Sequence, residues 1–420
     1  MSVVAPAARG ASRSSPAWQA AAVVVISFAV LVARRPSQFL HPYMWVEDGE
    51  PILRAYAERG LASLWEPVSG YLILATKLIT LASYQLAFEW APEIALALSV
   101  AFNCAVVLAV AFSPTHLRWP FLCAVAVLVI PVDPEVYAVS LLAFWWAGLL
   151  LVLALIWDAD RGPMWLRGGY VVLGGLSSPF MVAFAPLFVL RALLERRHSE
   201  IVIALLAVAV ALVQAWVIFA QHQVDYARTL DPHVIRITVD RFAGYLLVGP
   251  RNGNYYAGPI VLALLACALW QIRAKLTLHF VLLMLVWAAI CAATSQRGPI
   301  EVIHPVHAAA RYFFTPYIVL TWILIWLAAL SPWHVRILVL AGCLFGIASV
   351  VRHMTRQHDV MDWRGHVAAC ARSERYDLPI HYAGATSDLW YVKLTGGQCR
   401  DLVARSLFRR LPSDRPAAPR

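Results

Sequence analysis

The sequence predicts an all-α integral membrane protein, folded as a polytopic bundle of about eleven membrane-spanning helices. Hydrophobic residues make up 61% of its 420 positions and charged residues only 14%, and the mean hydropathy is +0.68. A net charge of +10 would suggest a nucleic-acid partner in a soluble domain. Here the arginines lie in short loops between apolar stretches, as in cytoplasmic membrane anchoring. Neither a soluble enzyme nor a nucleic-acid partner is therefore expected.

The predicted spans follow one another from the N-terminus. They cover residues 18–33, 93–112, 119–131, 136–157, 169–178, 180–190, 200–220, 256–272, 276–293, 313–330 and 333–350. The first stretch follows Arg9 and Arg13 and lacks a small-x-small cleavage site, so an uncleaved signal anchor is expected. Gly174-Gly175 and Ser177-Ser178-Pro179 interrupt the 169–190 stretch. That interruption predicts two half-length helices, which a membrane protein tolerates where they line a cavity.

The orientation depends on residues 70–90. Lys77 and Glu89 interrupt this apolar segment, so a span and an amphipathic helix on the membrane surface both fit. If the segment does not cross, the basic short loops nearly all fall on the side of the N-terminus, as the positive-inside pattern requires. We therefore predict a cytoplasmic segment 1–17 and a membrane domain 18–350. Residues 34–92 form its first external loop, with amphipathic surface helices.

The polar tail is expected on the external side. Residues 351–410 form a small C-terminal region in which runs 378–382 and 389–394 are predicted as strands, and residues 411–420 are predicted to be disordered. Cys370 and Cys399 lie in this tail without a CxxC or Cys/His spacing, so a zinc site is not expected. In an oxidising compartment the two could pair.

The candidate chemistry begins with Glu47, Asp48 and Glu50, which follow Met44-Trp45-Val46 beside the membrane. Ionisable groups near hydrocarbon are costly, so a dense acidic cluster there suggests a function. A carboxylate in this position could deprotonate a hydroxyl that attacks the anomeric carbon of a sugar. The alternative is that Asp48 or Glu50 caps the helix that starts near Pro51.

Basic side chains of the external loops could bind a phosphate, since arginine forks suit phosphate oxygens. Arg311 is the strongest phosphate-binding candidate because it immediately precedes the apolar run from Tyr312, at the depth of a lipid headgroup. Its alternative is a snorkelling interfacial arginine. Glu135 opens the fourth span and could line a cavity facing Asp48, or simply stabilise a helix N-terminus. The other candidates are Arg54, Lys77, Arg251, Arg297 and His304.

Together these features resemble the membrane-embedded glycosyltransferases of the GT-C class, which use polyprenyl-phosphate sugars as donors. The resemblance rests on Glu47-Asp48, the helix after Gly70-Tyr71, the interrupted 174–180 stretch and Arg311-Tyr312-Phe313-Phe314-Thr315-Pro316. It implies that Asp48 is the general base, with Glu47 second, and it places Tyr71 among the substrate-binding candidates. It implies no cofactor beyond the lipid-linked donor. The absence of a clear second acidic pair leaves a divalent metal requirement open.

The expected function is transfer of a sugar, with inversion, from a polyprenyl-phosphate donor to a glycan or lipid acceptor of the cell envelope. The arginine-rich composition suggests a GC-rich bacterium and a multi-pass protein of its inner (plasma) membrane. Two alternatives remain: a transporter or flippase of lipid-linked saccharides, which internal repeats would favour, and an O-antigen polymerase or ligase. The long loop from Gln221 to Tyr255 is compatible with the second alternative.

Overall fold

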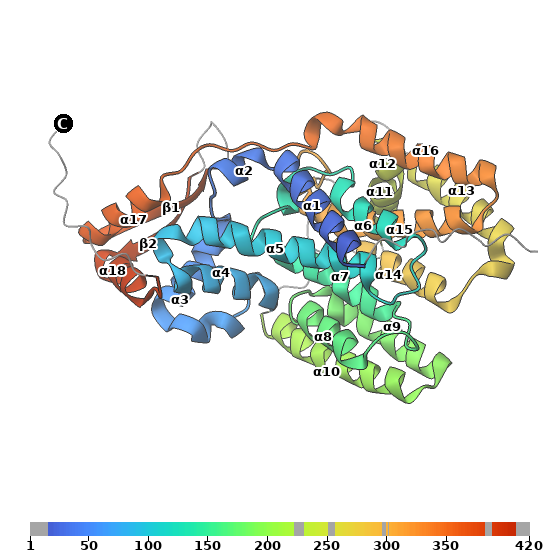
Figure 1. Ribbon diagram of the computed structural model, residues 1–420, viewed down its shortest axis with the longest axis horizontal. Coiled ribbons are helices and arrows are strands. Elements are labelled where there is room, and N and C mark those ends of the chain that lie inside the picture. The colour runs from blue at the N-terminus through green and yellow to red at the C-terminus, as the bar shows by residue number, and fades with distance from the viewer. Residues whose placement is uncertain are drawn as a thin grey trace, which may run out of the picture.

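A computed structural model describes residues 16–221, 231–250, 257–295, 300, 302–382 and 389–408. Within these ranges the chain is helical apart from one two-stranded sheet (Figure 1). The helices that match predicted spans are α1 (Pro16–Arg34), α5 (Ala91–Phe112), α6 (Pro120–Val129), α7 (Ala143–Leu155), α8 (Met164–Gly175), α9 (Phe180–Glu195), α10 (His198–Ala220), α13 (Ala257–Ile272), α14 (Leu278–Ser295), α15 (Arg311–Leu330) and α16 (Trp333–Ser349).

The remaining elements are shorter. The helices are α2 (Pro36–Leu40), α3 (Arg54–Arg59), α4 (Leu74–Leu86), α11 (Pro232–Val239), α12 (Tyr245–Val248), α17 (Trp363–Arg372) and α18 (Gly396–Arg405). The tight or widened helical turns are η1 (Asp48–Leu53), η2 (Gly60–Trp65), η3 (Phe88–Trp90), η4 (Pro134–Val136), η5 (Asp240–Gly244), η6 (Arg273–Lys275) and η7 (Val351–His353). The strands are β1 (Arg375–Tyr382) and β2 (Leu389–Thr395).

Each predicted apolar stretch contains a helix. Among the described residues, six helical segments are long and apolar enough to cross a membrane: Ala17–Arg34, Phe88–Phe112, His198–Ala220, Ala257–Lys275, Leu278–Ser295 and Arg311–Leu330. Shorter apolar helices are Pro120–Val129, Ala143–Leu155 and Trp333–Ser349. These helices indicate a multi-pass membrane protein. The predicted span 136–157 is helical only from Ala143, because irregular backbone and η4 occupy its first residues.

The loops gather at two ends of the helix bundle. At one end, Asp133 N–H donates to the Pro305 carbonyl over 2.8 Å, and Arg356 N–H donates to the Arg34 carbonyl over 3.0 Å. We call this the loop end; it holds residues 35–73, 131–142, 302–310, 351–382 and 389–408. At the opposite end, His116 N–H donates to the Ile156 carbonyl over 3.0 Å.

A buried ionic cluster fixes the opposite end. Arg167 donates two hydrogen bonds to Glu200, of 2.6 and 2.7 Å, and Arg191 donates another of 3.0 Å. Both arginines also donate to carbonyls of the last turn of α7, those of Ala154 and Leu155. Those carbonyls have no partner within the helix, so the arginines satisfy them and lock α7 against α8, α9 and α10.

The interruption between α8 and α9 forms as predicted, and α4 docks onto it. Leu74 N–H donates to the Leu176 carbonyl over 3.1 Å, and Ala75 N–H donates to the Ser177 hydroxyl over 2.8 Å. Gln214 of α10 joins the same contact by bonding both the N–H and the carbonyl of Leu72. The interruption therefore supplies the polar groups that hold the N-terminus of α4 inside the protein.

Helix α4 differs from the expected surface helix. It is 13 residues long and packs against α5 and α7, with Thr76, Lys77 and Thr80 all buried. Thr76 donates to the Leu141 carbonyl over 2.6 Å and Thr80 donates to Asp48 over 2.8 Å. These polar residues form hydrogen bonds within the protein, so they do not form a solvent-exposed face of the helix. The segment predicted as an amphipathic surface helix is therefore packed against other helices, with these polar residues buried.

The C-terminal region contains the predicted pair of strands, which run antiparallel and are flanked by α17 and α18. Cys370 of α17 and Cys399 of α18 form a disulfide bond, as their position in one polar tail allowed. The region packs on the first loop: Trp363 Nε1 donates to the Phe88 carbonyl over 2.9 Å. Figure 1 shows α17, α18 and the strands beside α3 and α4.

Candidate active site at the loop end of the bundle

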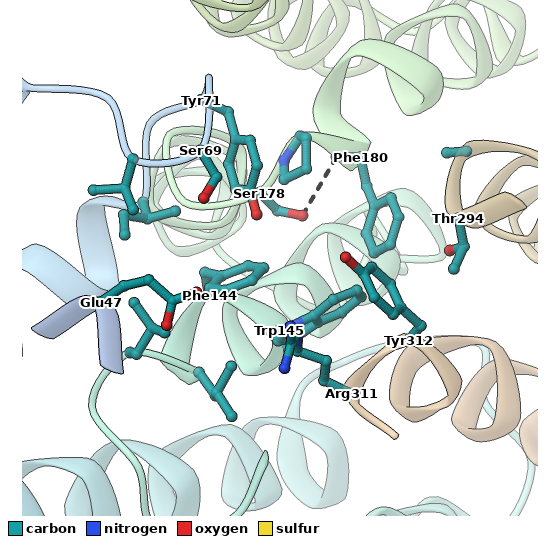
Figure 2. Close-up of a pocket in the computed structure, with 16 residues that line it drawn as sticks. Glu47, Ser69, Tyr71, Phe144, Trp145, Ser178, Phe180, Thr294, Arg311 and Tyr312 are labelled. Atoms are coloured by element: carbon teal, nitrogen blue, oxygen red, sulfur yellow. Dashed lines mark hydrogen bonds between the residues drawn. The ribbon is translucent and has the colours of Figure 1, made fainter. Parts of the chain in front are cut away.

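A cavity of about 250 Å³ opens at the loop end. Its lining combines one acid, one arginine, three serine or threonine hydroxyls from separate segments and an aromatic wall that includes two tyrosines (Figure 2). The lining residues are Glu47, Val68, Ser69, Tyr71, Ile73, Leu141, Leu142, Phe144, Trp145, Ser178, Pro179, Phe180, Ala293, Thr294, Arg311 and Tyr312. A mostly apolar cavity with a few convergent polar groups is the usual form of a small-molecule site.

Helix ends position the polar lining residues. Glu47 immediately precedes η1, Arg311 is the first residue of α15, and Thr294 lies in the last turn of α14. Ser178 comes from the interruption between α8 and α9. Ser69 lies in the turn closed by hydrogen bonds between Val68 and Tyr71. Segments far apart in the sequence therefore converge because each apolar helix ends at the same depth of the bundle.

Arg311 is held in place by Glu135. One guanidinium nitrogen of Arg311 forms an ion pair with a Glu135 carboxylate oxygen, and the Arg311 backbone N–H donates to the other oxygen over 3.3 Å. The Arg311 side chain is 30% exposed, whereas that of Glu135 is 6% exposed. A guanidinium has five N–H donors, so this pairing leaves others able to reach a ligand.

Glu47 lies on the other side of the cavity from Arg311 (Figure 2). Burial raises the pKa of the Glu47 carboxyl, and the nearby positive charge of Arg311 opposes that rise. Glu135 adds a smaller like-charge effect that raises the pKa of Glu47 further. A carboxyl whose pKa is raised toward the working pH is suited to accept a proton during a reaction.

Three lining residues carry a buried polar atom without a hydrogen-bond partner in the described part of the chain. They are Oε2 of Glu47, Nε1 of Trp145 and Oγ1 of Thr294. Buried polar atoms are nearly always paired in folded proteins, because leaving one unpaired costs about 1–3 kcal/mol. Glu47 Oε2 needs a donor, Trp145 Nε1 needs an acceptor, and a hydroxyl can serve as either. A ligand with several hydroxyl groups would satisfy all three.

Asp48 has a different environment from Glu47. It is fully buried, and its carboxylate accepts hydrogen bonds from the Trp45 N–H at 3.0 Å, Ser140 Oγ at 2.7 Å and Thr80 Oγ1 at 2.8 Å. Burial raises its pKa to about 6, and the three donors partly oppose that rise. Asp48 is not a cavity-lining residue. It joins the first loop to α4 and to the segment before α7.

The other sequence candidates are dispersed. Tyr71 lines the cavity, with its ring 5.8 Å from that of Phe144. Arg54 pairs with Glu50 at 2.6 Å on the surface. Lys77 is buried and donates to the Ser63 carbonyl over 3.1 Å, and burial lowers its pKa to about 8. Neither Arg54 nor Lys77 lines the cavity.

Of the three remaining candidates, His304 is described and the other two lie outside the described residues. His304 stacks on His307 with ring centroids 4.6 Å apart, outside the cavity lining, and burial lowers the pKa of His304 to about 4. Arg251 and Arg297 lie outside the described residues. Across the described part of the chain, no group of three or more His, Cys, Asp or Glu residues is placed to hold a metal ion.

Sequence reasoning missed the aromatic wall. Phe144, Trp145, Phe180 and Tyr312 line the cavity, and the ring of Trp145 is 5.7 Å from those of both Phe180 and Tyr312. In the sequence these residues sit inside apolar runs, where aromatic side chains ordinarily face the core or lipid. Only the Trp145 indole carried a sequence signal for a site, because a Trp N–H usually finds a hydrogen-bond partner when it is buried.

Fold and cavity together define a helical, multi-pass membrane protein with a polar and aromatic cavity at one end of its bundle. No family model, no curated protein and no solved structure matches the chain.

Proposed function

We propose that the protein is a membrane glycosyltransferase. In this proposal the cavity binds the sugar of a polyprenyl-phosphate donor, and a hydroxyl of a cell-envelope glycan or lipid is the acceptor. The observation that carries the proposal is the placement of Glu47 and Arg311 in one cavity, with unpaired polar atoms and aromatic rings between them. A base, a cation for the leaving group and a polyol-binding wall are the parts that such a transfer requires.

Glu47 takes the role of general base in this proposal, in place of Asp48. It accepts the proton of the acceptor hydroxyl as that oxygen attacks the anomeric carbon of the donor. The bond from the anomeric carbon to the phosphate oxygen breaks, and its electrons leave with the polyprenyl phosphate. Arg311, oriented by Glu135, stabilises the negative charge that grows on the leaving phosphate. Direct displacement of this kind inverts the anomeric configuration.

The preference for Glu47 rests on access and available lone pairs. Asp48 is fully buried and both of its oxygens already accept hydrogen bonds, whereas Glu47 lines the cavity and one of its oxygens is unpaired. A general base must come within hydrogen-bond distance of the proton that it removes. Glu47 can do so without rearrangement of the loop.

The test is a transfer assay with purified protein, a polyprenyl-phosphate sugar and a cell-envelope extract that contains both glycans and lipids as acceptor. Glu47→Gln is expected to lower the rate at least about 100-fold, in line with the contribution of a general base. Glu50→Gln is the matched control, because Glu50 lies three positions away and pairs with Arg54 on the surface. This control should transfer at close to the wild-type rate.

The Asp48→Asn variant tests whether Asp48 or Glu47 is the general base. Asparagine has the shape of aspartate, and its carbonyl can still accept from the Trp45 N–H and Ser140, while the Thr80 hydroxyl can rotate to accept from the amide. This variant should therefore keep most of the activity that Glu47→Gln loses. If Asp48→Asn loses transfer activity and Glu47→Gln retains it, Asp48 is the general base. Wild-type turnover in both variants would refute an acidic base in this loop.

The proposed orientation places the loop end on the external side of a bacterial inner membrane, with the N-terminus cytoplasmic. Reporter fusions after Gly60, Arg118 and Val351 test this orientation, and an external Arg118 would overturn it. A transporter or flippase of lipid-linked saccharides would move the lipid-linked sugar between leaflets without cleaving it. An intact donor after incubation, together with its movement across vesicles, would favour that alternative.

A further inference from the structure

The buried contact between Gly49 and Ile380 joins the acidic loop to the C-terminal region. A Cβ atom added to Gly49 would lie 2.2 Å from Cγ1 and 2.7 Å from Cδ1 of Ile380. Atoms cannot approach so closely, so the backbone beside Glu47 and Asp48 seats directly against this one side chain. Gly49 does not have the positive φ angle that favours glycine. Space is therefore the reason for glycine at this position.

Ile380 lies at an irregularity in the sheet. The pairing of β1 with β2 shifts register between Pro379 and His381, which leaves Ile380 as the extra residue. Ile380 is fully buried, as are Leu378 and Val392 of the same sheet. The Cys370–Cys399 disulfide ties together the two helices that flank this sheet.

The C-terminal region also contacts the end of α4, which in turn binds the acidic loop. Leu407 and Phe408 donate their N–H groups to the carbonyls of Gln85 and Leu86, over 2.9 and 2.8 Å, at the end of α4. From the preceding residue of α4, the Tyr84 hydroxyl donates to the Asp48 backbone carbonyl over 2.7 Å. The C-terminal region therefore contacts the loop directly through Ile380 and indirectly through α4.

We propose that Ile380 is a positioning residue for the reaction: by seating on Gly49, it fixes the backbone that presents Glu47 to the cavity. The C-terminal region is then a part of the active-site architecture and not an appendage. This inference rests on the proposed function, because it assigns Ile380 its effect through Glu47. A displacement of about 1 Å at a catalytic group can cost on the order of 100-fold in rate.

The test enlarges the side chain at Gly49 and then shortens the side chain at Ile380. Gly49→Ala inserts a methyl group against Ile380 and should lower kcat at least about tenfold with a smaller change in KM. The double variant with Gly49→Ala and Ile380→Ala removes the two clashing carbons and should recover kcat to within about threefold of Ile380→Ala alone. Leu402→Ala is the matched control, because Leu402 is buried on α18 in the same region. It should lower the melting temperature and leave kcat near wild type.

Two results would overturn the proposal: wild-type kcat in Gly49→Ala, or a double variant no more active than Gly49→Ala. A further measurement covers the case in which Gly49→Ala does not fold. Hydrogen–deuterium exchange of folded Ile380→Ala should be faster in the peptide covering 45–53 and unchanged in that covering α7. Unchanged exchange at 45–53 would also overturn the proposal. The exchange result needs no transfer activity, so an inactive wild-type protein would count against the glycosyltransferase function alone.

Discussion

Arg311 binds Glu135 through both its guanidinium and its backbone N–H, although the two residues are 176 positions apart. The pair joins the first turn of α15 to η4, and it fixes the only arginine that lines the described part of the cavity. Charge-assisted pairs of this kind set geometry as well as energy. Glu135 is thus placed to orient Arg311 without reaching the cavity itself.

The first prediction concerns this pair. Glu135→Gln keeps the shape and one acceptor oxygen but removes the charge that holds the guanidinium, so Arg311 should turn toward other partners. We expect transfer to fall about tenfold or more, the result of losing one charge-assisted hydrogen bond of about 1.5–3 kcal/mol. Steady-state kinetics with the polyprenyl-phosphate donor measures it. Arg311→Lys should show a raised donor KM, since lysine keeps the charge and loses the fork. Unchanged kinetics in both variants would contradict a phosphate role.

The second prediction concerns the stability supplied by Asp48. Asp48→Ala leaves the Trp45 N–H without its acceptor and removes the partner of two buried hydroxyls. Each unpaired buried donor costs about 1–3 kcal/mol, so the melting temperature in detergent should fall well below that of Asp48→Asn. Differential scanning fluorimetry measures the difference. Equal melting temperatures for the two variants would show that these hydrogen bonds do not support the fold.

The third prediction concerns pH. Burial raises the pKa of Asp48 from 3.8 to about 6, so between those values the folded protein holds a proton that the unfolded chain releases. Because the folded state binds more protons in this window, the contribution of Asp48 to stability falls as the pH rises through 6. Asp48→Asn should therefore lose less stability than the wild type between pH 4 and pH 6. Parallel pH profiles of melting temperature would contradict a raised pKa.

The fourth prediction concerns the disulfide. Cys370 and Cys399 are 29 positions apart, and closing a loop of that size contributes about 3 kcal/mol. Both cysteines should resist alkylation until a reductant is added, and reduction should lower the melting temperature of the C-terminal region. Cys370→Ser with Cys399→Ser is the matched variant, whose melting temperature should no longer respond to reductant. Alkylation of the unreduced wild-type protein at these positions would show that the bond is absent.

The fifth prediction concerns the opposite end of the bundle. Glu200→Ala would leave Arg167 and Arg191 buried without their shared partner and should cost about 3–5 kcal/mol. Asp160→Ala is the matched comparison, because Asp160 pairs with Arg197 on the exposed surface. That pair should contribute at most about 1 kcal/mol. Chemical denaturation of both variants measures the contrast, and similar losses would argue against a buried cluster.

The sequence by itself determined the helical elements. Their stretches are apolar and carry few charges, so burial in lipid or protein requires helices that satisfy their own backbone groups. The interruption at Ser177-Ser178-Pro179 was likewise readable, because proline and small polar residues break helices locally. The sequence also indicated that Cys370 and Cys399 could pair, since the other cysteines lie in apolar stretches.

Only the tertiary structure decided what each carboxylate in the acidic loop does. Glu47 and Asp48 are adjacent and chemically alike, so no pattern separates a cavity-lining acid from a buried one. The partners that separate them come from elsewhere: Thr80 and Ser140 surround Asp48, whereas Arg311 lies across the cavity from Glu47. These contacts depend on which helix ends are neighbours. The packing of segments that are distant in the sequence determines that arrangement. The same holds for the contact of Ile380 with Gly49, because only the packing of distant segments brings these two residues together.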